Sequence, residues 1–193
     1  MERQHFEGDL ETLKHRLLHM GSLIEAQTHK ALVSLMERRP ELARAVIEGD
    51  VAVNLLQMEV DDRCLKMLAL QQPIATDLRL ITSAMKMGSD LERIGDQAVN
   101  IAETALRLHE APPLRPVIDI AEMSEIAQKT TRDALDAFVR RDAALARDVL
   151  LRLLPPGLQA APLAAHREDE PDVDDGEDAD ADEHDKTPLG RGE

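Results

Sequence analysis

Residues 72–103 carry the clearest pattern in the chain: Gln72-Pro-Ile-Ala-Thr-Asp77-Leu-Arg79-Leu-Ile-Thr-Ser-Ala-Met-Lys-Met-Gly-Ser-Asp90-Leu-Glu92-Arg93-Ile-Gly-Asp96-Gln-Ala-Val-Asn100-Ile-Ala-Glu103. Proline suits the first turn of a helix, where an N–H has no partner, and Asp77 suits the positive end of the helix dipole. No further proline occurs before Pro112. The segment therefore predicts one long helix of about ten turns. Its apolar stripe is Leu80, Ala84, Met87, Leu91, Ile94, Ala98 and Ile101.

A polar stripe crosses the middle of the same segment. Glu92, Asp96 and Asn100 are four residues apart, so their side chains stack on one helix face. Like charges at this spacing repel by roughly a few tenths of a kcal/mol, which a solvated surface tolerates. The stripe is either a solvated face that pairs with Arg79 or Arg93, or part of a cation site. Spacing alone favours the solvated face, because charge runs usually face solvent.

The preceding residues predict further helices joined by short connections. A first helix runs from about Phe6 to Arg38, a short one from Glu41 to Glu48, and a third from Val51 to about Ala69. Gly49 is expected to end the short helix, and Asp50 to cap the next one. The stripe expected to be buried in the first helix is Leu10, Leu13, Leu17, Met20, Ile24, Thr28, Ala31 and Leu35. Long antiparallel helices with short connections form a bundle, so we expect an all-α fold.

Composition supports this fold class and limits the function. The 193 residues include two Phe and no Tyr or Trp, so the core is aliphatic, which suits packed helices. A lone cysteine, Cys64, fits a reducing compartment, and acidic residues occupy the place of a signal peptide. No apolar run is long enough to span a bilayer, and no basic patch indicates a nucleic-acid binder. We expect a cytoplasmic protein with no direct membrane insertion.

The tight turn at Gln72 predicts which residues of the neighbouring helices face each other. Residues equally far from an antiparallel turn lie side by side, so Asp50 and Asn54 should face the segment that holds Glu92 and Asp96. Three carboxylates and an amide form an all-oxygen set that suits a hard or borderline divalent metal, or iron. Arg93 is an alternative partner for the same charges.

The segment Asp77-Leu-Arg79-Leu-Ile, followed by Asp90-Leu-Glu92-Arg93-Ile-Gly-Asp96-Gln-Ala-Val-Asn100-Ile-Ala-Glu103, resembles the signature of the PhoU family of phosphate-signalling proteins. The resemblance extends upstream through Asp50-Val-Ala-Val-Asn54 and covers residues 5 to about 152. It implies two tandem three-helix bundles and metal bound by Glu-x-x-x-Asp segments. Carried over, Glu92 and Asp96 are the metal motif, with Asp50 and Asn54 as partners, and we then favour metal binding over the solvated face.

The resemblance also implies a function and partners. Family members are negative regulators of the phosphate-starvation response, thought to bridge the phosphate transporter's ATPase subunit (PstB-like) and a sensor histidine kinase (PhoR-like). We expect Asp77, Arg79, Asp90 and Arg93 to contribute polar contacts to such partners. A di-metal carboxylate enzyme built on the same patch is the alternative. The absence of a core histidine or other catalytic base in the sequence pattern favours the non-enzymatic regulator.

The second half of the chain begins a repeat that does not continue. A shift of 103 residues aligns Met20 with Met123 and Arg38 with Arg141, but the counterpart of Asp50 is Leu153. No second acidic motif follows, so natural truncation and a frameshift are both open, as is an inactive remnant. Apolar residues of this partial repeat must fold back, bind a partner or pair with another copy, and we favour a homodimer on residues 118–151. They are Ile126, Leu135, Phe138 and Leu145.

Four regions follow from these patterns. Residues 1–111 form the first bundle, 112–117 a proline-containing linker, 118–154 the partial second repeat of two helices, and 155–193 an acidic tail. The tail holds 13 acidic and 3 basic residues, a net charge of −10, whereas residues 1–154 carry only −5. Its composition cannot bury enough apolar surface to fold alone, so we expect it to be disordered.

Overall fold

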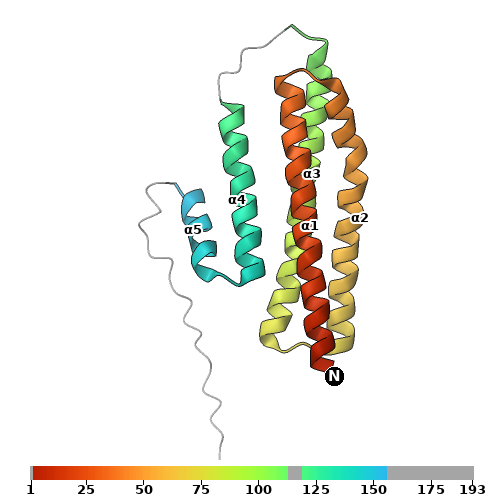
Figure 1. The fold of residues 1–193 in the computed structure, drawn as a ribbon, viewed down its shortest axis with the longest axis vertical. Helices are drawn as coiled ribbons and strands as arrows, with labels where there is room; N and C mark the ends of the chain where they lie inside the picture. The colour runs from red at the N-terminus through yellow and green to blue at the C-terminus, as the bar shows by residue number, and fades with distance from the viewer. Residues whose placement is uncertain (1, 113–118, 156–193) are drawn as a thin grey trace, which may run out of the picture.

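The computed structural model describes residues 2–112 and 119–155, which contain five α-helices and no strand (Figure 1). The helices are α1 (Glu2–Met36), α2 (Pro40–Gln71), α3 (Ala75–His109), α4 (Ile120–Arg140) and α5 (Ala143–Leu153). The all-α prediction is therefore confirmed, with a three-helix bundle followed by two further helices. The expectations for most of the 112–117 linker and for the acidic tail lie outside the described residues.

The long helix α2 runs antiparallel to both α1 and α3, and the three helices pack as a bundle (Figure 1). Helix α4 packs on α1, on the side of the bundle away from α2, and α5 returns along the lower half of α4. Each long helix contacts the other two, so the core runs along their common axis. Among the described residues, no helix is long and apolar enough to cross a membrane.

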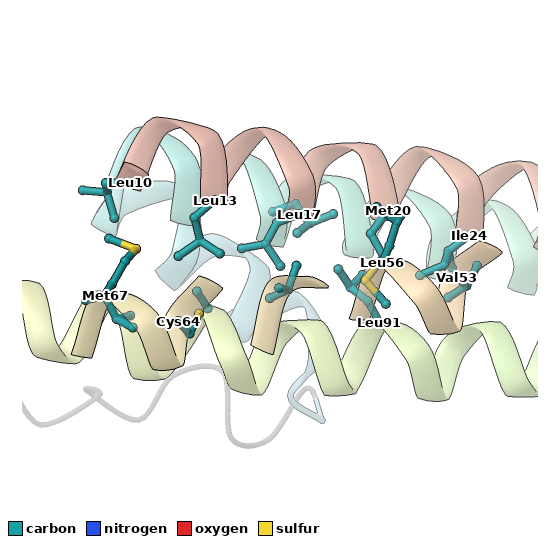
Figure 2. Close-up of a cluster of buried hydrophobic side chains, with 14 residues drawn as sticks. Leu10, Leu13, Leu17, Met20, Ile24, Val53, Leu56, Cys64, Met67 and Leu91 are labelled. Carbon is teal, nitrogen blue, oxygen red and sulfur yellow. The ribbon is translucent and has the colours of Figure 1, made fainter. Parts of the chain in front are cut away.

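The main core is aliphatic, as the composition predicts. Figure 2 shows apolar side chains of α1 pointing toward those of α2 along the bundle axis. Cys64 lies in this layer with no exposed surface, and burial is the main reason that the pKa of its thiol rises to about 12. The labelled members are Leu10, Leu13, Leu17, Met20, Ile24, Val53, Leu56, Cys64, Met67 and Leu91.

The expected break at Gly49 is wrong, because α2 is continuous from Pro40 to Gln71 and Asp50 is an interior residue rather than a cap. A glycine inside a helix costs only about 1 kcal/mol relative to alanine. Burial of Val46 and Val53 on either side of it outweighs that cost. Gly49 also provides space, since a Cβ there would lie 3.3 Å from the Gln27 side-chain nitrogen.

The buried face of α3 is rotated from the predicted stripe and consists mainly of small residues. Predicted positions such as Met87 and Ile94 are only half-buried, whereas Gly88 and Gly95 are buried. Added Cβ atoms at these glycines would lie 3.2 Å from Val60 and 3.4 Å from Val53 of α2. Small residues thus allow close approach of α2 and α3. The buried set of α3 is Ile81, Ala84, Gly88, Leu91, Gly95, Ala98, Ala102 and Ala105.

Arg38 binds the C-terminal end of α3 at the end of the bundle where α1 is followed by α2. Arg38 has a left-handed backbone, with φ of 56°, and its guanidinium donates hydrogen bonds to the Leu108, His109 and Ala111 carbonyls at 2.9, 2.7 and 2.5 Å. These carbonyls lie at the C-terminus of α3, where helical partners are lacking and a cation is favoured. Arg38 therefore ties the α1–α2 turn to the end of α3.

The helical hairpin α4–α5 attaches to the bundle through α1. Leu135 of α4 packs against Gly21 so closely that a Cβ on Gly21 would overlap its side chain. Arg132 of α4 forms an ion pair with Glu25 of α1. Of the apolar residues expected to need a cover, Leu135 is therefore folded back on the bundle, whereas Ile126 stays 58% exposed.

Candidate cation site between α1, α2 and α3

The site predicted from sequence lies where α2 passes α3 near the middle of the bundle. A Cβ on Gly95 of α3 would lie 3.8 Å from Asp50 Oδ1, so the predicted register of the two helices is confirmed. Asn54 Nδ2 donates a hydrogen bond to Asp50 Oδ2 at 2.8 Å. Glu92 and Asp96 flank Gly95 on α3, with Glu92 half-buried and Asp96 exposed. The metal assignment itself stays a prediction.

Buried oxygen atoms at this point find no hydrogen-bond donor among the described residues. They are Asp50 Oδ1, Asn54 Oδ1 and Gln27 Oε1. A buried acceptor without a partner costs about 1–3 kcal/mol, so three of them in one region are unfavourable as they stand. A single bound cation can satisfy several acceptor oxygens at once. The chemistry of these three oxygens therefore fits a cation.

Gln27 is a site residue that the sequence analysis missed. It is buried on α1, with 8% of its surface exposed, and its Oε1 and Asp50 Oδ1 would each lie 3.8 Å from a Cβ on Gly95. The predicted stripe of α1 instead included Thr28, which is half-buried. The sequence did contain a signal, because the Gln27 amide directly precedes the predicted position Thr28 in an otherwise apolar stripe. A buried polar residue needs a partner, so an amide at this place indicates a polar site.

Glu92 reports the electrostatics of the site. Burial, together with repulsion from Asp96 and Asp50, raises the pKa of its carboxyl group. The opposing attraction from Arg93 is the smallest of the contributions. The acidic groups of α2 and α3 are therefore close enough to repel each other, and Arg93, which is exposed, does not neutralise them.

Carboxylates alone do not complete a coordination shell here. Within residues 2–112 and 119–155, no three His, Cys, Asp or Glu side chains are grouped as a ready set of metal ligands. The unpartnered oxygens come partly from amides, on Gln27 and Asn54. Amide and carboxylate oxygens are ligands that hard divalent cations accept. The residues present thus fit a cation held by a mixed oxygen set to which Asp50 contributes the buried carboxylate.

The structure separates the residues expected to contact partners into two places. Asp90 and Arg93 are exposed near Glu92 on α3, with Arg93 Nη1 3.7 Å from Asp90 Oδ1. Asp77 and Arg79 lie at the start of α3, far along the helix from them. Asp77 lines an open cleft of about 690 Å³ together with Phe6 of α1. The four residues therefore do not form one surface.

The described architecture is that of a helical-bundle protein with an all-oxygen polar site inside its first bundle. The family model described as PhoU domain matches residues 17–105. The PhoU homolog of Aquifex aeolicus, named as a phosphate-specific transport system accessory protein, is 42% identical over 142 residues, which cover 74% of this chain and 64% of that protein. The equally named homolog of Pseudomonas putida is 42% identical over 76% of this chain and 57% of its own length.

A solved structure agrees with these relatives. The crystal structure of PhoU from Pseudomonas aeruginosa matches with a TM-score of 0.71 and 38% identity, over 76% of this chain and 70% of that chain. The chain belongs to the PhoU family. It spans 64% and 57% of the lengths of the Aquifex and Pseudomonas putida relatives.

Proposed function

We propose that this chain is a cytoplasmic, non-enzymatic regulator of phosphate uptake and of phosphate-starvation signalling that binds a cation in its first bundle. Its relatives are named as phosphate-specific transport system accessory proteins. The observation that carries the proposal is the group of unpartnered oxygens on Gln27, Asp50 and Asn54 in a chain of this family. The cation is a divalent metal or iron.

Each residue of the site has a distinct role in this proposal. Asp50 provides the buried carboxylate, and Gln27 and Asn54 provide neutral oxygens from two helices. Glu92 and Asp96 add negative charge from α3. A bound cation supplies the positive charge that these groups lack, so it joins α1, α2 and α3 and offsets the repulsion at Glu92.

Binding at this site is tested by elemental analysis of protein purified without chelators. We expect metal in the wild type and none in Glu92→Ala/Asp96→Ala, because the double variant removes the α3 charges. Asp90→Ala/Glu103→Ala is the matched control, since both residues are exposed acids on the same helix, and it should retain the metal. Equal metal in all three proteins, or none in the wild type, contradicts the assignment.

The regulatory role includes partners. We propose that the chain acts as an adaptor between a PstB-like transporter ATPase subunit and a PhoR-like sensor histidine kinase, and that it forms a homodimer. Asp77, Arg79, Asp90 and Arg93 are the candidate polar contacts. Because Asp77 and Asp90 are thirteen residues apart on α3, about 20 Å along the helix, the two places can serve different partners.

Cells that lack the full-length regulator provide the functional test. Expression of this chain should restore repression of a phosphate-starvation reporter in high phosphate, and Glu92→Ala/Asp96→Ala should not. Pull-down with the transporter ATPase and the kinase then assigns the partners, with Asp77→Ala and Asp90→Ala tested separately. If the wild type is stably produced and gives no repression, this chain does not carry the regulatory role and the proposal fails.

A further inference from the structure

The outer face of α2 carries an apolar seam that no described residue covers. Val51, Leu55, Met58 and Leu65 are 62%, 61%, 63% and 57% exposed. They continue a spacing of alternating three and four residues that also includes Arg44, Glu48 and Asp62. We call these seven positions the α2 seam. This is the spacing with which two helices interlock in a coiled coil.

The seam is separate from the face that builds the bundle. Val53, Val60 and Met67, at seven-residue spacing, are among the α2 residues that enter the core. The seam lies on the other side of the helix, and in Figure 1 α2 forms the outer edge of the bundle away from α4 and α5. Exposed apolar residues scattered singly are ordinary, but Val51, Leu55 and Met58 occupy three successive positions of the seam, and such a row indicates a partner helix.

We propose that the α2 seam binds the α2 seam of a second copy of this chain in antiparallel orientation. This inference rests on the proposed homodimer and on neither the phosphate role nor the cation. The antiparallel arrangement places Val51 against the partner's Leu55 in the two central layers. It then places Met58 against the partner's Glu48, Arg44 against the partner's Asp62 and, at each end, Leu65 against the partner's Glu41.

Charge complementarity selects this arrangement. The antiparallel pairing contains two Arg–Asp contacts, whereas a parallel pairing in register opposes Arg44 to Arg44, Glu48 to Glu48 and Asp62 to Asp62. Like charges that face each other in a coiled coil repel, so they disfavour the parallel pairing. An antiparallel pair shifted by one heptad opposes Asp62 to Val51 and Arg44 to Ala69, so it loses both Arg–Asp contacts.

Other occupants fit the seam less well. The chain's own residues 155–193 carry a net charge of −10 and little apolar periodicity, so they match neither the apolar centre of the seam nor Asp62. The exposed apolar residues of the hairpin, Met123 and Ile126 on α4 and Leu150 and Leu153 on α5, are divided between two helices. We therefore favour α2 over the hairpin, where the sequence led us to expect the dimer.

Sedimentation velocity over a range of protein concentrations tests the surface. We expect the wild type to dimerise and Leu55→Lys to raise the dissociation constant by about tenfold or more, since the substitution buries a charge at the centre of the contact. Ile126→Lys is the matched control, at a side chain of 58% exposure against 61% for Leu55. It should leave the dissociation constant unchanged, and circular dichroism should give equal helix content for all three proteins.

A charge swap tests the orientation. Arg44→Asp and Asp62→Arg should each weaken the dimer, and the double variant should recover it, because each layer again holds opposite charges. Asp62 also lies 2.6 Å from Lys66 within the helix, so helix content must be compared for the single variants. A double variant weaker than both singles overturns the antiparallel pairing.

Two further results would overturn the α2 seam contact, and they differ in whether the homodimer itself survives. A wild type that stays monomeric at every concentration removes both the seam contact and the homodimer. A dimer that Ile126→Lys disrupts and Leu55→Lys does not retains the homodimer and assigns it to the hairpin.

Discussion

The first bundle and the α4–α5 hairpin are two versions of one pattern that differ in what surrounds them. Arg38 and its counterpart Arg141 both end a helix with a left-handed backbone, at φ of 56° and 54°. Arg38 caps α3, whereas Arg141 is exposed beyond the end of α4. Met20 has no exposed surface, and its counterpart Met123 is 59% exposed.

The difference teaches that local structure and burial have separate causes. The shared pattern is sufficient to form a helix, a left-handed turn and a second helix in both halves. Burial of the methionine requires neighbours equivalent to α2 and α3, and α5 ends at Leu153, where the first copy has Asp50 and a further twenty-one residues of α2. Of the candidate cation site, Asn54, Glu92 and Asp96 fall in the part of the pattern that is present once.

The largest expected effect comes from truncating the two matched methionines. Met20→Ala should lower the free energy of unfolding by about 2–5 kcal/mol, because it removes buried contacts and leaves a cavity. Met123→Ala should change it by less than about 0.5 kcal/mol, as exposed substitutions usually do. Urea denaturation followed by circular dichroism measures both. Equal losses for the two variants would mean that Met123 is covered in solution.

A second prediction separates the hairpin from the bundle. Gly21→Ala places a methyl group against Leu135 and should weaken packing of α4 on α1 by about 1–2 kcal/mol, since overpacking forces one helix to shift. Hydrogen exchange should become faster in α4 and stay slow in α2 and α3. Gly8→Ala is the control, because a Cβ there has no atom within 4 Å among the described residues. Unchanged exchange in α4 would contradict this packing.

The smallest predicted effect uses the cysteine as a reporter of the bundle alone. The Cys64 thiol has a pKa of about 12 when folded, against 9.0 in the unfolded chain, so the folded state keeps a proton that the unfolded state loses between these values. Stability should therefore fall as pH rises from about 9 toward 12, by about 1 kcal/mol per pH unit.

Denaturation series at pH 8, 9 and 10 measure this slope. Cys64→Ala is less stable at every pH because it leaves a small cavity, but its slope in this window should be shallower than that of the wild type. Parallel slopes for the two proteins would exclude the thiol as the cause. The chain has no tyrosine, so no phenol titrates in the same range.

The sequence was sufficient to predict the helices, the bundle and the register of Asp50 against α3, because these follow from periodicity and from one short turn. It misplaced a helix boundary at Gly49, where a glycine and an aspartate form a typical cap signal. Local propensity there amounts to about 1 kcal/mol, and the buried residues Val46 and Val53 outweigh it. Only tertiary packing decides such a case.

The sequence predicted only part of the candidate site, because tertiary packing decides which residues of α1 and α2 face inward. Charged residues at four-residue spacing are visible in sequence, so Glu92 and Asp96 could be assigned to one helix face. Gln27 could not, because a rotation of α1 by one residue decides whether Gln27 or Thr28 enters the core. Likewise α2 has apolar residues on two faces, and sequence alone does not say that Val53 faces inward and Leu55 outward.

The glycines that let α2 approach α3 also limit how this protein can change its length in evolution. Val53 and Val60 are seven residues apart, as are Gly95 and Gly88, which they contact. Insertion of a single residue between either pair rotates one helix by about 100° and moves a side chain into the other backbone. Seven residues added to α2 and α3 at the same level keep their valine–glycine contacts, and α1 needs the same addition because it packs on both helices. Insertions and deletions should therefore be tolerated when all three helices change by matched sets of seven, and rejected singly.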